Sequence, residues 1–321
     1  MKLKSSAIAV AVAGALGASM AVQAESGFYG SVRVGLQYLD TAGESNTTVR
    51  GYASRFGFRG ETDMGNGLTG FGRYEFGVAT EGTGPNVTRR HAYVGMKGDW
   101  GSVILGQTYH TYYNFISGPL DNPWWGSGDA MLAYTGRTAQ AITYAGSFGM
   151  VAVGATAYLD DSATDTSGKA EDLDGYELAA SIQAGPIKLG LGIQDRGNDQ
   201  GGGDPDSEPT VGLTASGWET GMFTWGLGYA QQDNEGVGAT GTANSIVFDV
   251  QIANGYVHYE MLDMDTGGGP GDSPTALTLG YTQSVGRQTT MWYEVESYDA
   301  DTTVSDDDAT IVRAVLKYDW K

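Results

Sequence analysis

Three histidines are the residues of this 321-residue chain best suited to acid or base chemistry: His91, His110 and His258. The alternation around His91 places it on the apolar side of its segment, whereas His258 shares the polar side of its segment with Glu260. A lone histidine on a polar face is more often solvated than catalytic. We therefore expect no enzyme, and the absence of cysteine excludes thiol chemistry and a disulfide scaffold.

Acidic residues gather in two short runs, at 263–265 and at 306–308. Neither run has the spacing and the closing glutamate of a calcium loop, so we expect no metal site and no cofactor. These runs are better interpreted as exposed loop carboxylates. Divalent cations would allow them to contact lipopolysaccharide.

Basic residues recur on the polar sides of segments that alternate between apolar and polar residues. Arg55 and Arg59 lie on the side opposite Phe56. The same test places three further charged residues on polar sides: Arg73, Glu75 and Arg137. Because charged groups require water or a partner, these sides are expected to face water.

About sixteen segments show this alternation, which is typical of strands with one apolar and one polar face. They lie near 27–39, 50–61, 68–79, 88–98, 101–110, 137–146, 149–159, 174–184, 187–196, 210–219, 222–232, 244–253, 255–264, 275–285, 288–298 and 309–320. Small and polar residues dominate the polar faces, which would enclose water rather than form a core. The pattern predicts an all-β fold, a transmembrane antiparallel β-barrel of sixteen strands with lipid outside and water inside.

Residues 1–24 have the features of a secretory signal peptide, with Lys2 and Lys4 before an apolar stretch and small residues before Glu25. Residues 25–321 show no composition break, so we expect one barrel domain. Without the signal and its two lysines, the chain carries 38 acidic and 16 basic residues, a formal net charge of −22. This charge disfavours a nucleic-acid partner.

Tight Gly- and Asn-containing turns alternate with longer acidic connections, among them 160–174, 197–209, 233–243, 265–274 and 299–308. The connection from about 111 to 136 differs, because it abandons alternation and is rich in aromatic residues. These include Tyr112, Tyr113, Trp124 and Trp125. We expect this loop to be ordered and folded into the barrel lumen.

Five groups of residues carry a resemblance to a known family. They are Arg55–Thr62, Leu68–Glu75, Arg90–Lys97, the set Gly101, Ser102, Gly106 and Tyr109, and Tyr134–Tyr144. They resemble the second to fifth strands, and the strand after the third loop, of the trimeric general diffusion porins of Gram-negative outer membranes. In that family the third loop folds inward and narrows the pore. The resemblance therefore implies the same barrel and the same constriction loop.

The resemblance also implies a charged constriction, in which arginines on the wall face acids on the loop. The matching wall positions are Arg55, Arg90 and Arg137, with Arg59 as a further basic residue, and side-chain alternation adds Arg73. The matching loop acids are Asp121 and Asp129. Opposed charges across a narrow opening create a field that orders water and aligns dipolar solutes.

These features predict an outer-membrane homotrimer that contacts lipid and lipopolysaccharide and passes ions and small hydrophilic solutes by passive diffusion. We expect a weak cation preference, because acidic loops outnumber the lumen arginines. One alternative is a substrate-selective channel of the oligosaccharide type, in which the aromatic residues of the 112–125 region bind sugars. Two further alternatives are an outer-membrane hydrolase and a purely structural barrel with a plugged lumen.

Overall fold

The computed structural model describes residues 25–41, 43–82, 86–123, 136–159, 173, 175–195, 209–236, 239–264, 273–300 and 308–320. The predicted signal peptide lies outside these ranges, as do the predicted site residues Trp124, Trp125 and Asp129.

Eighteen strand segments make up the described part of the fold. They are β1 (Glu25–Thr41), β2 (Glu44–Gly51), β3 (Ser54–Gly65), β4 (Leu68–Val78), β5 (Val87–Gly98), β6 (Gly101–Tyr109), β7 (Arg137–Thr138), β8 (Ala141–Phe148), β9 (Val151–Tyr158), β10 (Gly175–Ala184), β11 (Ile187–Asp195), β12 (Thr210–Thr220), β13 (Phe223–Gly236), β14 (Ala239–Ile252), β15 (Gly255–Met264), β16 (Thr275–Gly286), β17 (Thr289–Asp299) and β18 (Ala309–Trp320). Segments β2 and β3 continue one strand across a break, as do β7 and β8, so the segments form sixteen strands. Each break contains a residue with positive φ, 53° at Ala53 and 55° at Gln140.

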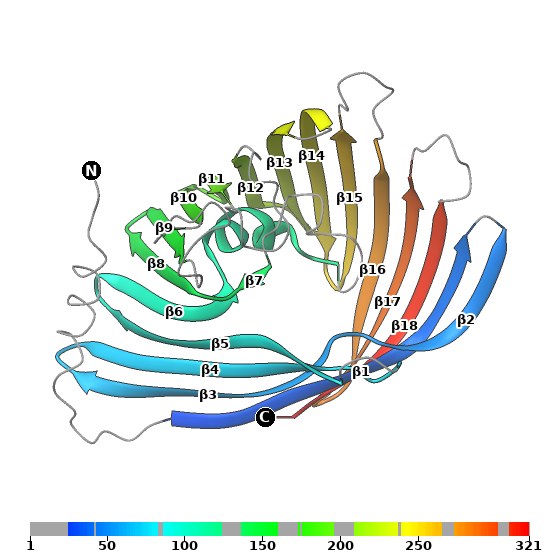
Figure 1. Ribbon diagram of the computed structural model, residues 1–321. Helices are drawn as coiled ribbons and strands as arrows, with labels where there is room; N and C mark the ends of the chain where they lie inside the picture. Colours follow the sequence, from blue (N-terminus) through cyan, green and yellow to red (C-terminus); the bar gives the residue numbers. More distant parts are fainter. Residues whose placement is uncertain are drawn as a thin grey trace.

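These strands close into a barrel. Consecutive strands pair antiparallel from β3 to β18. Strand β1 pairs with β2 and β3 on one side. On its other side β1 pairs with β18, from Gly30 opposite Trp320 to Thr41 opposite Ala309, and this pairing closes the ring. Figure 1 shows the resulting ring of strands. The predicted sixteen-stranded antiparallel barrel is confirmed.

Two hairpins are longer than the alternation predicted. Strand β2 begins at Glu44 rather than near residue 50, and its side chains are almost all exposed. Strands β13 and β14 pair as far as Gly236 and Ala239, so most of the predicted 233–243 loop is strand. Alternation marks only strand that has different surroundings on its two faces; in β2, water reaches both faces while the backbone ladder continues.

The two faces of the barrel are inverted relative to a soluble protein. Apolar side chains such as Val94 and Leu191 are 62% and 55% exposed on the outside, whereas Glu75, Glu177 and Glu260 are each 0% exposed on the inside. An apolar outer face suits lipid and a polar inner face suits an aqueous lumen.

The chain between β6 and β7 folds into the barrel, and we call its described part, residues 110–123, the inner loop. It contains a π-helical turn, η1 (Tyr113–Ser117), and a 3-10 turn, η2 (Gly118–Leu120). Figure 1 shows these turns on the inner side of β10 to β12. The predicted inward folding of the 111–136 loop is confirmed for its described residues. Within the described ranges, no helix is long and apolar enough to cross a membrane.

Glycines on the wall make room for this loop. A Cβ at Gly192 would lie 2.7 Å from Ile116 Cγ1, and one at Gly190 would lie 2.8 Å from the Phe115 carbonyl oxygen. A Cβ at Gly154 would lie 2.8 Å from the Phe115 ring. Any side chain at these positions would displace η1, so the wall and the loop fit each other closely.

Three clusters of buried apolar residues lie inside the barrel, two of them where the loop meets the wall. Tyr112, Phe115 and Ile116 form one cluster. Leu120 forms another with Ala230 and Val247 of the wall. A third, comprising Tyr52, Trp292 and Val315, belongs to the wall itself. The loop is therefore fixed by hydrophobic packing as well as by its polar contacts.

Candidate functional site

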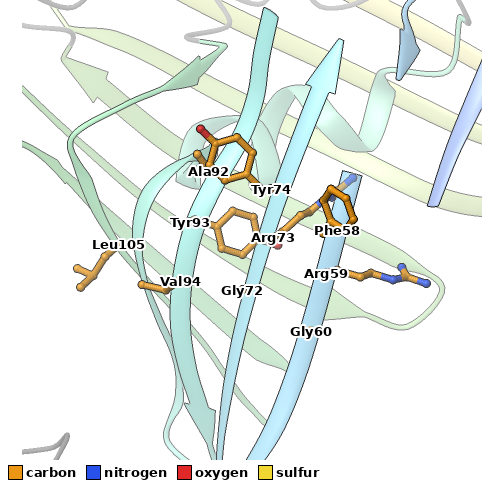
Figure 2. Close-up of a pocket in the computed structure, with 10 residues that line it drawn as sticks. All are labelled: Phe58, Arg59, Gly60, Gly72, Arg73, Tyr74, Ala92, Tyr93, Val94 and Leu105. Atoms are coloured by element: carbon orange, nitrogen blue, oxygen red, sulfur yellow. The ribbon is translucent and has the colours of Figure 1, made fainter. Parts of the chain in front are cut away.

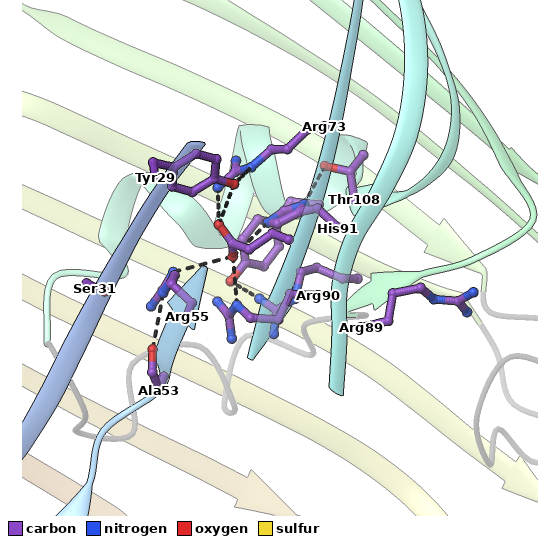
Figure 3. Close-up of polar contacts among 12 residues, drawn as sticks. Tyr29, Ser31, Ala53, Arg55, Arg73, Arg89, Arg90, His91 and Thr108 are labelled. Atoms are coloured by element: carbon purple, nitrogen blue, oxygen red, sulfur yellow. Dashed lines mark hydrogen bonds and ion pairs between the residues drawn. The ribbon is translucent and has the colours of Figure 1, made fainter. Parts of the chain in front are cut away.

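Glu75 on β4 is the centre of a charged cluster on the inner wall. Its Oε1 lies 2.9 Å from Arg90 Nε on β5 and 3.9 Å from Arg55 Nη1 on β3. Arg73 makes an ion pair with Oε2. Figure 3 shows Arg55, Arg73 and Arg90 on the inner wall, with dashed lines for their ion pairs with Glu75. Three arginines sharing one carboxylate leave this cluster with excess positive charge facing the lumen.

A β-bulge in β5 turns both Arg90 and His91 inward. Glu75 pairs with His91 and Phe76 pairs with Arg89, so Arg90 is the extra residue. His91 is only 4% exposed, and its Nε2 lies 3.9 Å from Glu75 Oε1. The prediction that His91 lies on the apolar, outward side was wrong, because strict alternation does not account for a bulge.

Tyr29 on β1 connects this cluster to a further arginine. Its hydroxyl accepts a hydrogen bond from Arg73 Nε at 2.6 Å and donates one to Glu75 Oε2 at 2.9 Å. The Arg59 and Arg73 Cζ atoms lie 5.5 and 5.3 Å from its ring centroid, within cation–π range. Sequence reasoning missed two inward residues of β1. They are Tyr29 and Arg33, which lie on the same side of the strand.

Arg137 and Asp121, predicted to face each other, are connected through two tyrosine rings. The Arg137 guanidinium lies 4.7 Å above the Tyr109 ring centroid and donates to a Tyr109 hydroxyl. Tyr109 and Tyr113 stack with centroids 4.0 Å apart, and the Tyr113 hydroxyl donates to Asp121 Oδ2 at 2.7 Å. Burial raises the pKa of Asp121 above its usual range, and the Tyr113 hydrogen bond partly opposes this shift.

The far end of the inner loop is tied to β14. Asn122 Nδ2 donates to Asp249 Oδ1 at 2.6 Å and Asn122 Oδ1 accepts from Gln251 Nε2 at 2.6 Å. His258, which was expected to be a lone solvated histidine, bridges Asp249 and Glu260 with ring nitrogen to oxygen distances of 3.1 and 2.7 Å. The described part of the inner loop therefore runs along the inner wall from β10 to β14, where Asn122 holds it.

The structure thus brings together Arg55, Arg73 and Arg90, with Arg59 beside them on Tyr29, and places Arg137 and Asp121 at the loop. Tyr112 is 0% exposed and packs against the wall, so its ring does not line the opening. In the described part of the chain, no group of three or more His, Cys, Asp or Glu residues is placed to hold a metal ion.

An apolar groove lies on the outside of the same strands. Gly60, Gly72 and Ala92 leave space between Phe58 and Tyr74 on one side and Val94 and Leu105 on the other. Figure 2 shows these side chains on β3 to β6, with Arg73 directed to the opposite face of the sheet. This groove belongs to the outer apolar surface, not to the charged lumen.

Comparison with known proteins gives a consistent result. The sequence profile of the Gram-negative porins matches residues 5–319. Outer membrane porin F of Xenorhabdus nematophila is 33% identical over 174 residues, which cover 49% of this chain and 46% of that protein. Outer membrane porin OmpD of Salmonella typhimurium strain SL1344 is 29% identical over 252 residues, which cover 71% of this chain and 64% of that protein. The chain thus aligns with about half to two thirds of the length of these relatives.

Solved structures share the fold. A loop-deletion mutant of OmpT from Vibrio cholerae superimposes with a TM-score of 0.73 at 17% identity, covering 92% of this chain and 99% of that one. An anion-selective porin from Comamonas acidovorans gives a TM-score of 0.71 at 16% identity, covering 93% of this chain and all of that one. With the closed barrel, the match to the Gram-negative porin profile and to outer membrane porins locates the protein in the outer membrane of a Gram-negative bacterium. The chain belongs to the Gram-negative porin family.

Proposed function

We propose that this chain forms a water-filled channel through which ions and small hydrophilic solutes diffuse passively across the outer membrane. The observation that carries this proposal is the arginine cluster around Glu75, which lines the inner wall of a closed barrel beside an inner loop anchored at both ends. A filter of this kind requires no reaction: the width of the opening excludes large solutes and the fixed charges discriminate among small ones.

The constriction comprises Arg55, Arg59, Arg73, Arg90 and Arg137 on the wall and Asp121 on the inner loop, with Asp129 farther along the same connection. Three wall arginines share Glu75 directly, and Arg137 lies over the ring of Tyr109 on β6, which in turn stacks on Tyr113 of the inner loop. Because screening by salt is weakest inside a narrow, partly enclosed space, these charges are expected to influence ion choice more per charge than those of the outer loops.

The channel works as a homotrimer in contact with lipid and lipopolysaccharide. A relative of the same fold, OmpT of Vibrio cholerae, is described in a trimer form. On this chain, Phe28, Phe58 and Trp320 form an aromatic surface on the outside of β1, β3 and β18, with ring centroids 5.2 Å apart for the two phenylalanines. An apolar outer surface of this kind suits contact with lipid or with a neighbouring subunit.

An oligosaccharide-selective channel has less support, because the described aromatic residues are already engaged. Tyr109 lies between Arg137 and Tyr113, and Tyr112 is buried. Sugar stacking requires exposed ring faces. Current through the channel should therefore not be blocked by maltose-type sugars.

Planar-bilayer recording of the wild type and of a variant lacking residues 115–128 tests the proposal. The wild type should form ohmic channels, and the deletion should raise their conductance and the permeability of cells to hydrophilic antibiotics. Heat-modifiable migration in gels shows whether the variant has folded. A folded deletion variant with unchanged conductance would contradict a narrowing role for the loop, and a folded wild type without conductance would contradict the channel itself.

A further inference from the structure

His110 occupies the point where the inner loop leaves β6, and its side chain is 0% exposed. Its Nε2 lies 2.7 Å from the Thr138 carbonyl oxygen, and its Nδ1 lies 2.8 Å from Thr143 Oγ1. A carbonyl oxygen only accepts hydrogen bonds, so Nε2 carries a proton. In the neutral ring Nδ1 is then an acceptor, and the Thr143 hydroxyl donates to it.

This assignment fixes a directed chain of hydroxyl groups. Thr143 Oγ1 accepts from the Thr156 hydroxyl at 3.0 Å. Thr156 Oγ1 in turn accepts from the Thr111 hydroxyl at 2.9 Å and from the Thr111 backbone N–H at 3.3 Å. Every proton between His110 and Thr111 therefore has one consistent position. The chain connects the loop to β8 and β9 through side chains that are at most 5% exposed.

A second contact runs from the same ring to β10. The Tyr158 ring meets His110 edge to face with centroids 5.4 Å apart, and its hydroxyl donates to Glu177 Oε1 at 2.5 Å. The other oxygen, Glu177 Oε2, accepts from the Tyr112 backbone N–H at 2.7 Å. Three successive residues, 110 to 112, are thus bound to the wall. The hydrogen bond from His110 to Thr138 also connects them to β7, the strand that follows the loop. We call residues 110–112 the loop base.

We propose that His110 is the positioning residue that holds the loop base against the wall, and that its protonation in acid releases the inner loop. The imidazolium form would place a cation in a buried site and a second ring proton on Nδ1. Thr143 would have to turn its hydroxyl proton away from Nδ1, and the directed chain through Thr156 to Thr111 would be disturbed at its first member. This inference rests on the proposed function, because it assumes that the inner loop narrows the channel.

The surroundings of the ring define the direction of the effect. Burial lowers the pKa of His110 below its usual range, while the Thr138 carbonyl and the Glu177 carboxylate partly oppose this shift. The charged and titratable groups that face it are Glu177 from β10 and Tyr158 from β9, and Arg137 precedes Thr138 on β7. Because the anchored state binds a proton less readily than a released, solvated loop, its stability falls as pH falls through and below the usual histidine range.

Single-channel recording between about pH 7 and about pH 4 tests, on the intact protein, whether acid releases the inner loop. In the wild type, brief current fluctuations from loop release should become roughly tenfold more frequent in acid, a change of the size that one buried hydrogen bond produces. H110Q is the matched variant, because a glutamine amide can donate to the Thr138 carbonyl but does not titrate in this range. It should show no acid-induced increase.

Hydrogen exchange of a peptide covering 110–117, corrected for the intrinsic effect of pH, measures loop release without measuring current. Wild type should lose protection in acid and H110Q should not. T156V, which removes the hydroxyl that holds Thr111, should show faster exchange at every pH, and it replaces H110Q if that variant does not fold. An acid response in H110Q equal to the wild type would overturn the proposal. Acid-induced exchange without any change in current would instead contradict the narrowing role of the loop.

Discussion

Arg90 Nε lies 2.9 Å from Glu75 Oε1, and this ion pair joins neighbouring strands on the inner wall of the barrel. Arg55 and Arg73 approach the same carboxylate, so Glu75 is the single negative charge among three positive ones. Removing this carboxylate would leave like charges close together with only water and mobile anions to balance them. The ion choice of the channel should therefore respond strongly to Glu75.

Replacing Glu75 with glutamine should shift the channel toward anions. The change removes one negative charge from the lumen, and we expect the ratio of chloride to potassium permeability to rise by about threefold to tenfold. The measurement is the reversal potential in a KCl gradient. Glu61→Gln is the matched control, because Glu61 is 56% exposed and is bound to Lys97 at the far end of β3. A shift of the same size in both variants would contradict a special role for Glu75.

A side chain at Gly192 should narrow the channel. In Gly192→Val the new atoms would meet Ile116 and push η1 away from the wall, toward the opening, because the Cβ position is only 2.7 Å from Ile116 Cγ1. Single-channel conductance should fall, whereas Gly27→Val should leave it unchanged because a Cβ there meets nothing within 4 Å. Unchanged conductance in a folded Gly192→Val protein would show that the position of η1 does not set the width.

Acid should weaken cation preference through Asp121. Burial raises the pKa of Asp121, so this carboxylate becomes neutral at a higher pH than an exposed aspartate and then no longer attracts cations. Reversal potentials between about pH 7 and about pH 3 should show this step in the wild type. The step should be absent in Asp121→Asn and lie at higher pH in Tyr113→Phe, which lacks the hydrogen bond that favours the ionised form. Identical dependence of the reversal potential on pH in all three proteins would contradict a position of Asp121 at the pore.

Alternation predicted the barrel because lipid and water select opposite side chains on the two faces of each strand. It was less informative where that contrast disappears, as in β2, which water reaches on both faces. It also misplaced His91, because the bulge beside Arg90 changes the side to which the following residue points. A bulge depends on the register between two strands, which a single segment does not reveal.

The site was predicted in part. The inward positions of Arg55, Arg73 and Arg90 could be predicted from alternation and from resemblance, because both signals can be seen within a single strand. Tyr29 is 44 positions from its partner Arg73, and Asn122 is 127 positions from Asp249. These contacts form only when the barrel closes and the loop enters it, so a single segment does not predict them. Aromatic content alone likewise did not distinguish Tyr112, which packs on the wall, from Tyr113, which stacks on Tyr109.

Two adjacent arginines on β5 offer the most direct test of the claim that charges on the inner wall filter ions. Arg90 faces Glu75, whereas Arg89 is exposed and points away from the cluster (Figure 3). Reversal potentials in a KCl gradient should therefore be measured for Arg90→Gln and Arg89→Gln, which remove the same charge from neighbouring positions. We predict that Arg90→Gln strengthens cation preference, by an amount that fades as salt is raised, and that Arg89→Gln leaves it unchanged. Equal reversal potentials for the two variants, in proteins that still form channels, would contradict the account.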